Sequence, residues 1–419
     1  TSHMVMPSGP TEMRGGRGRG VFGGGYNPTI NNVLNFVEIA SAGDATDFGD
    51  LSLSRKFIAS SGDSTRGLFM GGETPTSQSV IDYVTISSSG GANDFGDLTE
   101  AKDFGAACNS NVRGIYGGGN TGEYLTDIEF VIIQSTGQAN KFGDLTQARL
   151  GLGAGSSPTR AVFGGGSESP LNNLLLIDFI EIETGGTAIK FGELSVGRHY
   201  VSGISNSTRA LFAGGVTPTT VNTIDFITIA TTGNATDFGD MTVAARGLHE
   251  GSATTSTRGL LISGKYDSGY YNVINFVTFS TAGDAVDFGD QFLATNHEGS
   301  AESKTRGLVI NGANPGADNT MQYITIATQG NSADFGDMRA RDIHTGLKDP
   351  RRHDPLCHCW HCQPQLTQTR DALTRLRALL VTPAAASSPA LLVAKASSCQ
   401  QWTSLPSGHH PHRCSSILK

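Results

Sequence analysis

Short apolar runs alternate with polar, glycine-rich turns through most of this chain, and no long amphipathic helix pattern occurs before residue 365. The run at 224–229 is mostly apolar and β-branched, which is typical of a strand covered on both faces. A Thr-Thr-Gly-Asn-Ala turn at 231–235 leads from it to a further run at 237–241. In other copies of this pattern, two more runs come before the β-branched one. The first is glycine-rich, as in Leu-Gly-Leu-Gly-Ala-Gly at 150–155, and the second has the form Arg-Gly-Leu-Phe-X-Gly-Gly, as at 66–72. Each unit therefore predicts four short strands.

Three sequence markers show that this unit is repeated seven times. A Phe-Gly-Asp or Phe-Gly-Glu triplet begins at Phe48, Phe95, Phe142, Phe191, Phe238, Phe288 and Phe335. An arginine opens the second run at Arg19, Arg66, Arg113, Arg160, Arg209, Arg258 and Arg306. An aromatic residue lies in the third run at Phe36, Tyr83, Phe130, Phe179, Phe226, Phe276 and Tyr323. Successive triplets are 47 to 50 residues apart.

Four strands per unit, this period and seven copies predict an all-β fold, a seven-bladed β-propeller of four-stranded blades over residues 19–347. A solenoid is the alternative, but solenoids need capping repeats, which the pattern does not show.

Ring closure is predicted to involve both ends of the array. The first repeat lacks an innermost strand that matches the consensus, and the segment 340–347 follows the seventh triplet. We expect this segment to pair with residues 19–50 and close blade one as a "velcro" strand, leaving no open edge. Residues 1–18 are interpreted as an N-terminal extension, whose Thr-Ser-His-Met start is similar to a cloning remnant.

The repeat resembles two groups of proteins. Its double glycine after an apolar strand, its downstream aromatic pair and its arginine resemble kelch-type propellers across residues 19–347, although kelch repeats carry tryptophan where this chain has the phenylalanine of the triplet. The wording Thr-Arg-Gly-Val-Phe-Gly-Gly-Gly with Asp-Phe-Gly-Asp-Leu resembles repeats in uncharacterised virion and tail-fibre proteins of marine phages. This second resemblance implies a role in the virion or in host contact, and therefore a virion or extracellular location.

Charge separates the repeats from the rest of the chain. The net charge is −8, but residues 348–419 hold nine Lys and Arg against three Asp and Glu, so residues 1–347 carry −14. An acidic propeller argues against nucleic acid as a partner. No run of 18 apolar residues predicts a membrane span. Residues 348–419 are rich in Cys, His and Pro, and we expect them to be disordered or an artefact of frameshift or read-through.

Several motifs in the repeat have a structural interpretation. Asp-Phe-Gly is a kinase motif, but here it recurs without the other kinase motifs, so we expect its Phe to fill the blade interface and its Gly to allow a bulge or close approach. Calcium binding by the neighbouring aspartates is disfavoured by Lys141 and Lys190 in two repeats. The repeat arginines are expected to bond backbone carbonyls or an Asp of the adjacent blade.

Histidines form the main irregularity in the innermost strands. His249, His297 and His344 each lie two residues before a glycine, and the first two are followed by Glu250 and Glu298. These groups are expected to line the centre of the ring as ordinary polar residues, with a small-ligand pocket or a metal-dependent site as alternatives. We predict no cofactor.

The loops between strands two and three differ from blade to blade, whereas the turns between strands three and four stay similar. Divergent loops on a rigid scaffold are typical of binding modules. Tyrosines suited to a protein or glycan surface occur in these loops at Tyr26, Tyr124, Tyr266, Tyr270 and Tyr271.

The leading hypothesis is therefore a non-enzymatic binding or structural module, a phage virion or host-attachment propeller similar to those of tail fibres. The alternative is a carbohydrate-binding propeller. A metal-dependent enzyme and an engineered scaffold are the remaining hypotheses.

Overall fold

The computed structural model describes residues 3–5, 18–26, 29–170, 172–248, 253–266, 269–294, 299–310 and 319–339. The chain divides between His344 and Thr345 into two units, and all the described residues belong to the first. The predicted tail, 348–419, lies outside the described residues.

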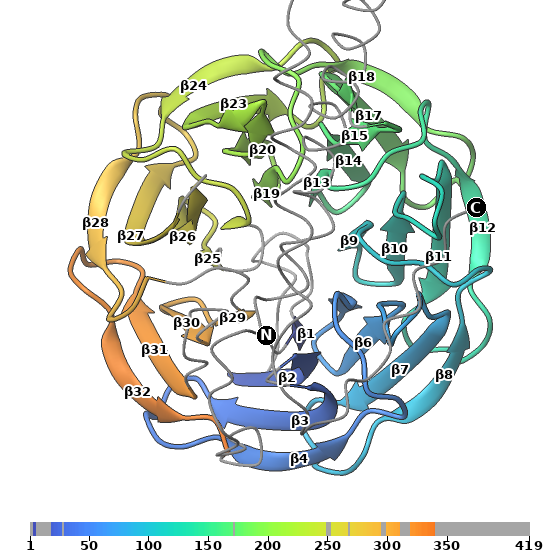
Figure 1. Ribbon diagram of the computed structural model, residues 1–419, viewed down its shortest axis with the longest axis vertical. Helices are drawn as coiled ribbons and strands as arrows, with labels where there is room; N and C mark the ends of the chain where they lie inside the picture. Colours follow the sequence, from blue (N-terminus) through green and yellow to red (C-terminus); the bar gives the residue numbers. More distant parts are fainter. Residues whose placement is uncertain are drawn as a thin grey trace, which may run out of the picture. The chain divides into compact units, whose positions relative to one another are not determined.

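Over the described residues the strands form seven four-stranded antiparallel sheets arranged in a ring (Figure 1). The all-β, seven-bladed propeller predicted from the repeat is confirmed. Blade one comprises β1 (His3–Val5), β2 (Arg19–Tyr26), β3 (Ile30–Glu38) and β4 (Thr46–Asp50). Blade two comprises β5 (Ala59–Gly62), β6 (Arg66–Met70), β7 (Val80–Thr85) and β8 (Asn93–Asp97). Blade three comprises β9 (Ala106–Asn109), β10 (Arg113–Gly117), β11 (Asp127–Ile132) and β12 (Asn140–Asp144).

The other four blades follow the same order, with two small hairpins added. Blade four comprises β13 (Gly153–Ser156), β14 (Arg160–Gly164), β17 (Leu176–Glu181) and β18 (Ile189–Glu193), with the hairpin β15 (Ser167–Glu168) and β16 (Asn172–Asn173). Blade five comprises β19 (Ser202–Ser205), β20 (Arg209–Ala213), β23 (Thr223–Thr228) and β24 (Thr236–Asp240), with the hairpin β21 (Val216–Thr217) and β22 (Thr219–Thr220). Blade six comprises β25 (Ala253–Thr254), β26 (Arg258–Tyr266), β27 (Gly269–Thr278) and β28 (Val286–Asp290), and blade seven comprises β29 (Gly299–Glu302), β30 (Arg306–Ile310), β31 (Thr320–Thr325) and β32 (Ala333–Asp337).

The innermost strand of blade one is not the one that the repeat pattern predicted. β1 pairs antiparallel with β2, with His3 opposite Gly23 and Val5 opposite Val21. The inner position is thus taken by residues that the sequence analysis left out of the fold, and the segment 340–347 lies outside the described residues. The ladder is made by backbone groups, so a segment can complete the edge of β2 without matching the repeat consensus.

Blades are joined at the rim through the Phe-Gly-Asp triplet. At the junction of blades seven and one, Gly43 N donates to the Phe335 carbonyl (2.6 Å) and Ala45 N donates to the Asp337 carbonyl (2.8 Å). The equivalent pair of bonds is present at each of the other six junctions, as at Gly90 N to the Phe48 carbonyl. Gly49, the glycine of the first triplet, has a φ of +132°, and a Cβ there would lie 2.5 Å from Gly91 N. The structural interpretation of the triplet is confirmed: its glycine allows the backbones of two blades to touch.

The repeat arginines form a second set of contacts between blades. Each guanidinium lies over the third-strand aromatic ring of its own blade, as Arg66 does over Tyr83 at 4.2 Å. Its Nη1 then donates to a carbonyl of the following blade, as from Arg66 to Ile133 (2.9 Å). Arg306 closes the ring by donating to the Ala40 carbonyl (2.9 Å). The expected bonds to carbonyls of the adjacent blade are therefore confirmed.

The core consists of seven clusters of buried apolar side chains, each between two neighbouring blades. In every blade the phenylalanine of the triplet packs edge-to-face on the third-strand aromatic, as Phe142 does on Phe130 with ring centroids 5.8 Å apart.

Among the described residues, buried ion pairs cross four of the junctions between blades. Three are Arg55–Asp82 (2.6 Å), Arg149–Asp178 (2.9 Å) and Arg198–Asp225 (2.8 Å), and the fourth is Lys102–Glu129; all eight side chains are fully buried. The cation comes from the connection between blades, and the acid comes from the third strand of the following blade. Burial lowers the pKa of the three arginines, and the charge of the partner acid opposes that shift.

The fifth junction keeps the acceptor but lacks the charges. Asn275 stands at the place of the acid and Ala245 at the place of the cation, and both are buried. The Asn275 side-chain oxygen accepts from Thr242 N (3.0 Å), as the Asp178 carboxylate does from Thr146 N (3.0 Å). The shared requirement is an oxygen that accepts this backbone N–H.

Replacing Arg198 by alanine should cost about 3–5 kcal/mol of unfolding free energy, because it leaves Asp225 buried without its cation. The double variant Arg198→Ala/Asp225→Asn copies Ala245 and Asn275, keeps the acceptor for Ser195 N, and should recover part of that loss. Chemical denaturation followed by circular dichroism measures both variants. A double variant no more stable than the single one would show that the orphaned carboxylate is not the source of the loss.

Candidate functional site

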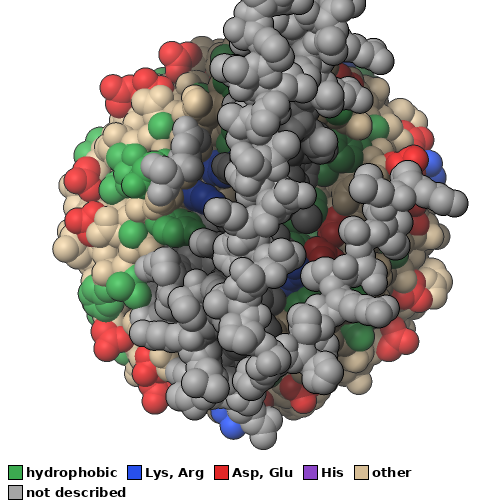
Figure 2. Space-filling model, in the orientation of Figure 1, with side chains coloured by type: hydrophobic (Ala, Val, Ile, Leu, Met, Phe, Trp, Pro, Cys, Tyr) green, Lys and Arg blue, Asp and Glu red, His purple; other side chains and the backbone are tan. Residues whose placement is uncertain are grey.

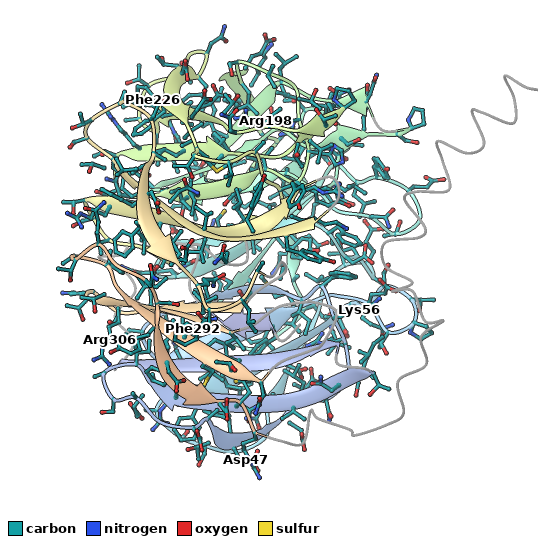
Figure 3. All side chains as sticks on the ribbon, turned by 60° about the vertical axis from the view of Figure 1, so that its left-hand side comes forward. Asp47, Lys56, Arg198, Phe226, Phe292 and Arg306 are labelled. Carbon is teal, nitrogen blue, oxygen red and sulfur yellow. The ribbon has the colours of Figure 1, made fainter. Side chains whose placement is uncertain are left out.

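One face of the propeller is formed by the connections between blades and by the loops between strands two and three; we call it the loop face. Figure 3 shows Lys56, on a connection, and Arg306, at the start of a second strand, on opposite sides of the ring. At five junctions the connection forms an antiparallel bridge to the loop of the next blade, and that loop pairs back on itself.

Each junction thus presents a row of three residues in one small ladder. The rows are Lys56–Glu73–Ser77, Asp103–Asn120–Tyr124, Leu150–Ser167–Asn173, His199–Val216–Thr220 and Arg246–Lys265–Tyr270. Their backbone geometry is the same, but their chemistry differs at every junction. Neighbouring rows also touch: Ser77 Oγ donates to Asp103 Oδ2 (3.4 Å), and Asn173 Oδ1 lies 2.6 Å from His199 Nδ1.

The residue after the first member of each row has a left-handed backbone. Glycine fills this position at Gly151 and Gly247, but the other three are aromatic: Phe57 (φ +55°), Phe104 (+52°) and Tyr200 (+53°). A bulky residue in this region is strained, and such strain concentrates at functional sites. Hydrogen bonds connect neighbouring positions, from Gly151 N to the Phe104 carbonyl (3.3 Å) and from Tyr200 N to the Gly151 carbonyl (2.7 Å).

The three aromatic side chains are partly exposed and are stacked on neighbours. The Phe57 and Phe104 rings come from successive junctions, yet their centroids lie 4.5 Å apart. The Tyr200 ring lies 4.7 Å from the His199 ring. We call Phe57, Phe104 and Tyr200 the aromatic collar.

Beside the collar, Asp103 is a buried carboxyl group held by neutral partners. Its Oδ1 accepts from Asn120 Nδ2 (3.4 Å) and its Oδ2 from Ser77 Oγ (3.4 Å). Burial raises the pKa of Asp103 to about 6; the bonds from Asn120 and Ser77 and the charge of Lys56 oppose the shift, whereas the charge of Glu73 adds to it. Asp103 therefore changes its charge just below neutral pH.

His199 is held neutral at the other end of the collar. Burial lowers its pKa to about 4, and the charge of Arg246 acts in the same direction. Burial also raises the pKa of Tyr200 to about 12. At neutral pH this part of the site consists of an imidazole, a phenol and the Asn173 amide, all able to form hydrogen bonds without a net charge.

The structure separates the predicted tyrosines into two places. Tyr124 belongs to the row of Asp103 and is partly buried. The rings of Tyr266 and Tyr271 lie 4.6 Å apart on the hairpin of β26 and β27, where Lys265 Nζ lies 5.8 Å from the Tyr270 ring. Tyr26 ends β2, and its side chain lies outside the described residues. The predicted tyrosines thus include one in the row of Asp103 and a separate group on blade six, and their role in binding stays a prediction.

The predicted histidine cluster, with His249, Glu250, His297, Glu298 and His344, lies outside the described residues. Within the described ranges, no group of three His, Cys, Asp or Glu side chains is placed to hold a metal ion. His297 lies nine residues before its repeat arginine, as Phe57, Phe104 and Tyr200 do, whereas in blade six the left-handed residue of the row is Gly247, eleven residues before Arg258.

Sequence reasoning missed the collar because it compared the repeats for histidine only. A signal was present in blades two to five: the position nine residues before the arginine holds Phe57, Phe104, Gly151 and Tyr200. These residues are aromatic or glycine.

Comparison of the sequence with protein-family models and with curated proteins finds no match. Among the described residues no helix is long and apolar enough to cross a membrane.

Stability should depend on pH through Asp103. Its raised pKa means that the stability present below pH 3.8 is lost as the pH rises through about 6, because the folded protein must then bury a carboxylate. Asp103→Asn should raise Tm at pH 7.5 by roughly 2–4 °C, and the gain should shrink as the pH falls towards 4. Thermal melts across this range measure it, with the exposed Glu123→Gln as control. An equal gain at both ends of the range would contradict the assignment.

Proposed function

We propose that this propeller is a non-enzymatic binding module whose ligand docks on the loop face. The observation that carries the proposal is the contrast between the two faces. The turns between strands three and four make the same backbone bonds to the preceding blade at all seven junctions, so they are committed to holding the ring. The five described rows of the loop face share one backbone geometry and display five different sets of side chains.

A constant scaffold with variable positions on one face is the arrangement of recognition modules. The rows are also held firmly. Each connection residue is bonded in both directions to the following loop, as Asp103 N is to the Asn120 carbonyl (3.1 Å) and Asn120 N to the Asp103 carbonyl (2.9 Å). Little conformational entropy is then lost when a ligand binds, which favours affinity.

We further infer a role in host attachment by a phage virion, with a virion or extracellular location. Support comes from the resemblance of the repeat to those of marine phage virion and tail-fibre proteins, and from the many-sided display on the loop face. We also propose that the repeat is related to those of kelch-type propellers, on the basis of its double glycine, aromatic pair and arginine.

Two substitutions of exposed threonines in blade three test which face binds. Thr121 lies on the loop face and Thr136 lies on the turn between strands three and four, so Thr121→Arg and Thr136→Arg introduce the same bulk and charge on opposite faces. The labelled full chain is expected to adsorb to at least one isolate in a panel of marine bacteria, and flow cytometry measures the adsorption. Thr121→Arg should reduce it by about tenfold, while Thr136→Arg should leave it unchanged.

Circular dichroism melts confirm that both variants are folded. Adsorption that depends on Thr136 but not on Thr121 would place binding on the turn face and contradict the proposal. A chain that adsorbs to none of the isolates would contradict the role in host attachment.

A further inference from the structure

The aromatic collar contributes little to the packing that holds the blades together. The seven buried apolar clusters account for all seven junctions, and none of them includes Phe57, Phe104 or Tyr200. The same backbone conformation is formed by glycine at Gly151 and Gly247 without strain. A bulky residue in this conformation costs about 1–3 kcal/mol. Three aromatic rings are thus kept where glycine would fold more easily, which points to a use outside the core.

The collar offers flat apolar surface at the inner end of the rows. Phe57 stacks on Phe104, and Lys56 Nζ lies 4.9 Å from the centroid of the Phe57 ring. Gly151 lies between Phe104 and Tyr200, and a Cβ there would be 3.4 Å from the Tyr200 ring. The absence of a side chain at Gly151 lets Tyr200 lie against the Gly151 backbone. The collar position therefore runs along four successive connections, with rings at the first, second and fourth and Gly151 at the third.

Hydrogen-bond donors and hydrogen-bond acceptors both flank these rings. Asp103 supplies carboxylate oxygens, Asn120 and Asn173 supply amides, Ser77 supplies a hydroxyl and His199 an imidazole. Several of these groups already bond one another between rows, so their positions are set before a ligand arrives. Flat apolar rings bordered by fixed donors and acceptors match a molecule that has apolar C–H faces and a rim of hydroxyls.

Charge selects among such molecules. Asp103 and Glu73 lie close enough for the charge of Glu73 to raise the pKa of Asp103, and the cation Lys56 is paired with Glu73 (3.5 Å). Asp and Glu side chains also recur around the rim of the propeller in Figure 2, in line with the −14 charge of residues 1–347. An anionic group would be repelled at the Asp103 end of the collar, where these two acids lie.

We propose that the aromatic collar, together with Asp103 and Asn120, forms a binding site for a neutral saccharide. The site lies between blades two and five, away from the tyrosines of blade six. This inference rests on the proposed function, since it names the ligand class of the loop face. Sugar rings stack on Phe104 and Tyr200, and sugar hydroxyls bond Asp103 and Asn120.

Glycine substitutions test the site with little risk to the fold, because the chain itself carries glycine at two equivalent positions. The variants are Phe104→Gly and Tyr200→Gly, with Tyr270→Ser on blade six as the matched control. The full chain and its variants are applied to an array of neutral glycans terminating in glucose, galactose, mannose or N-acetylglucosamine, with sialylated and uronic-acid glycans alongside. Titration calorimetry then measures Kd for the strongest glycan.

Binding to neutral glycans that falls by about tenfold or more in both glycine variants, and stays unchanged in Tyr270→Ser, is the expected result. Circular dichroism melts establish that the glycine variants remain folded. Binding that survives in the glycine variants and is lost in Tyr270→Ser would overturn the location. Preference for the anionic glycans would overturn the ligand class.

The failure of this inference is distinct from that of the proposed function. If no glycan binds while cell adsorption still depends on Thr121, the saccharide site is overturned and the loop face binds another class of molecule. If both glycan binding and adsorption are missing, the proposed function falls with it.

Discussion

The backbone contact between the fourth strand of one blade and the glycine turn of the next determines what the rest of the molecule can be. Two N–H groups of the turn donate to carbonyls of the Phe-Gly-Asp strand at every junction. The glycine of the triplet has to approach the neighbouring backbone so closely that a Cβ would overlap it, as at Gly49 against Gly91. These bonds satisfy backbone groups of the outermost strand that would otherwise be an open edge. They also fix the turn sequences, and they leave variation to the opposite face.

Between the blades, a buried side-chain oxygen of the third strand accepts a hydrogen bond from the preceding connection, and two kinds of side chain supply this oxygen. Four junctions bury a cation with an acid, whereas the junction at Asn275 uses an amide and an alanine. A buried ion pair contributes little to the net free energy of unfolding, but removing one partner is strongly destabilising because the other charge stays buried alone. A cation of this kind next to a blade that carries Asn275 in place of the acid would be buried alone, so the pairs favour blades that supply the acid.

The repeat predicted the fold because its markers are the residues that the geometry requires most strictly. Phe48 and its equivalents fill the interfaces between blades, and the arginines bond the next blade. Because each junction needs these contacts, the residues that make them recur in every repeat. Blade one could not be predicted in the same way, because β1 is held by backbone pairing that does not depend on the repeat consensus. Tyr124 was predicted from its loop and lies in the row of Asp103, but its role in binding stays a prediction. Phe104 and Tyr200 were missed because what their position shares is a left-handed backbone rather than one residue type.

Each repeat arginine donates a hydrogen bond to a carbonyl of the following blade. Every blade is therefore the donor at one junction and the acceptor at the other. The contacts are head-to-tail, like the heterologous interfaces of cyclic oligomers. Such interfaces can extend indefinitely unless the rotation between neighbours closes the cycle. Arg306 meeting Ala40 is that closure within a single polypeptide. The number of blades is thus a property of the angle at each junction, and a chain with one repeat more or fewer would have to change all seven angles together.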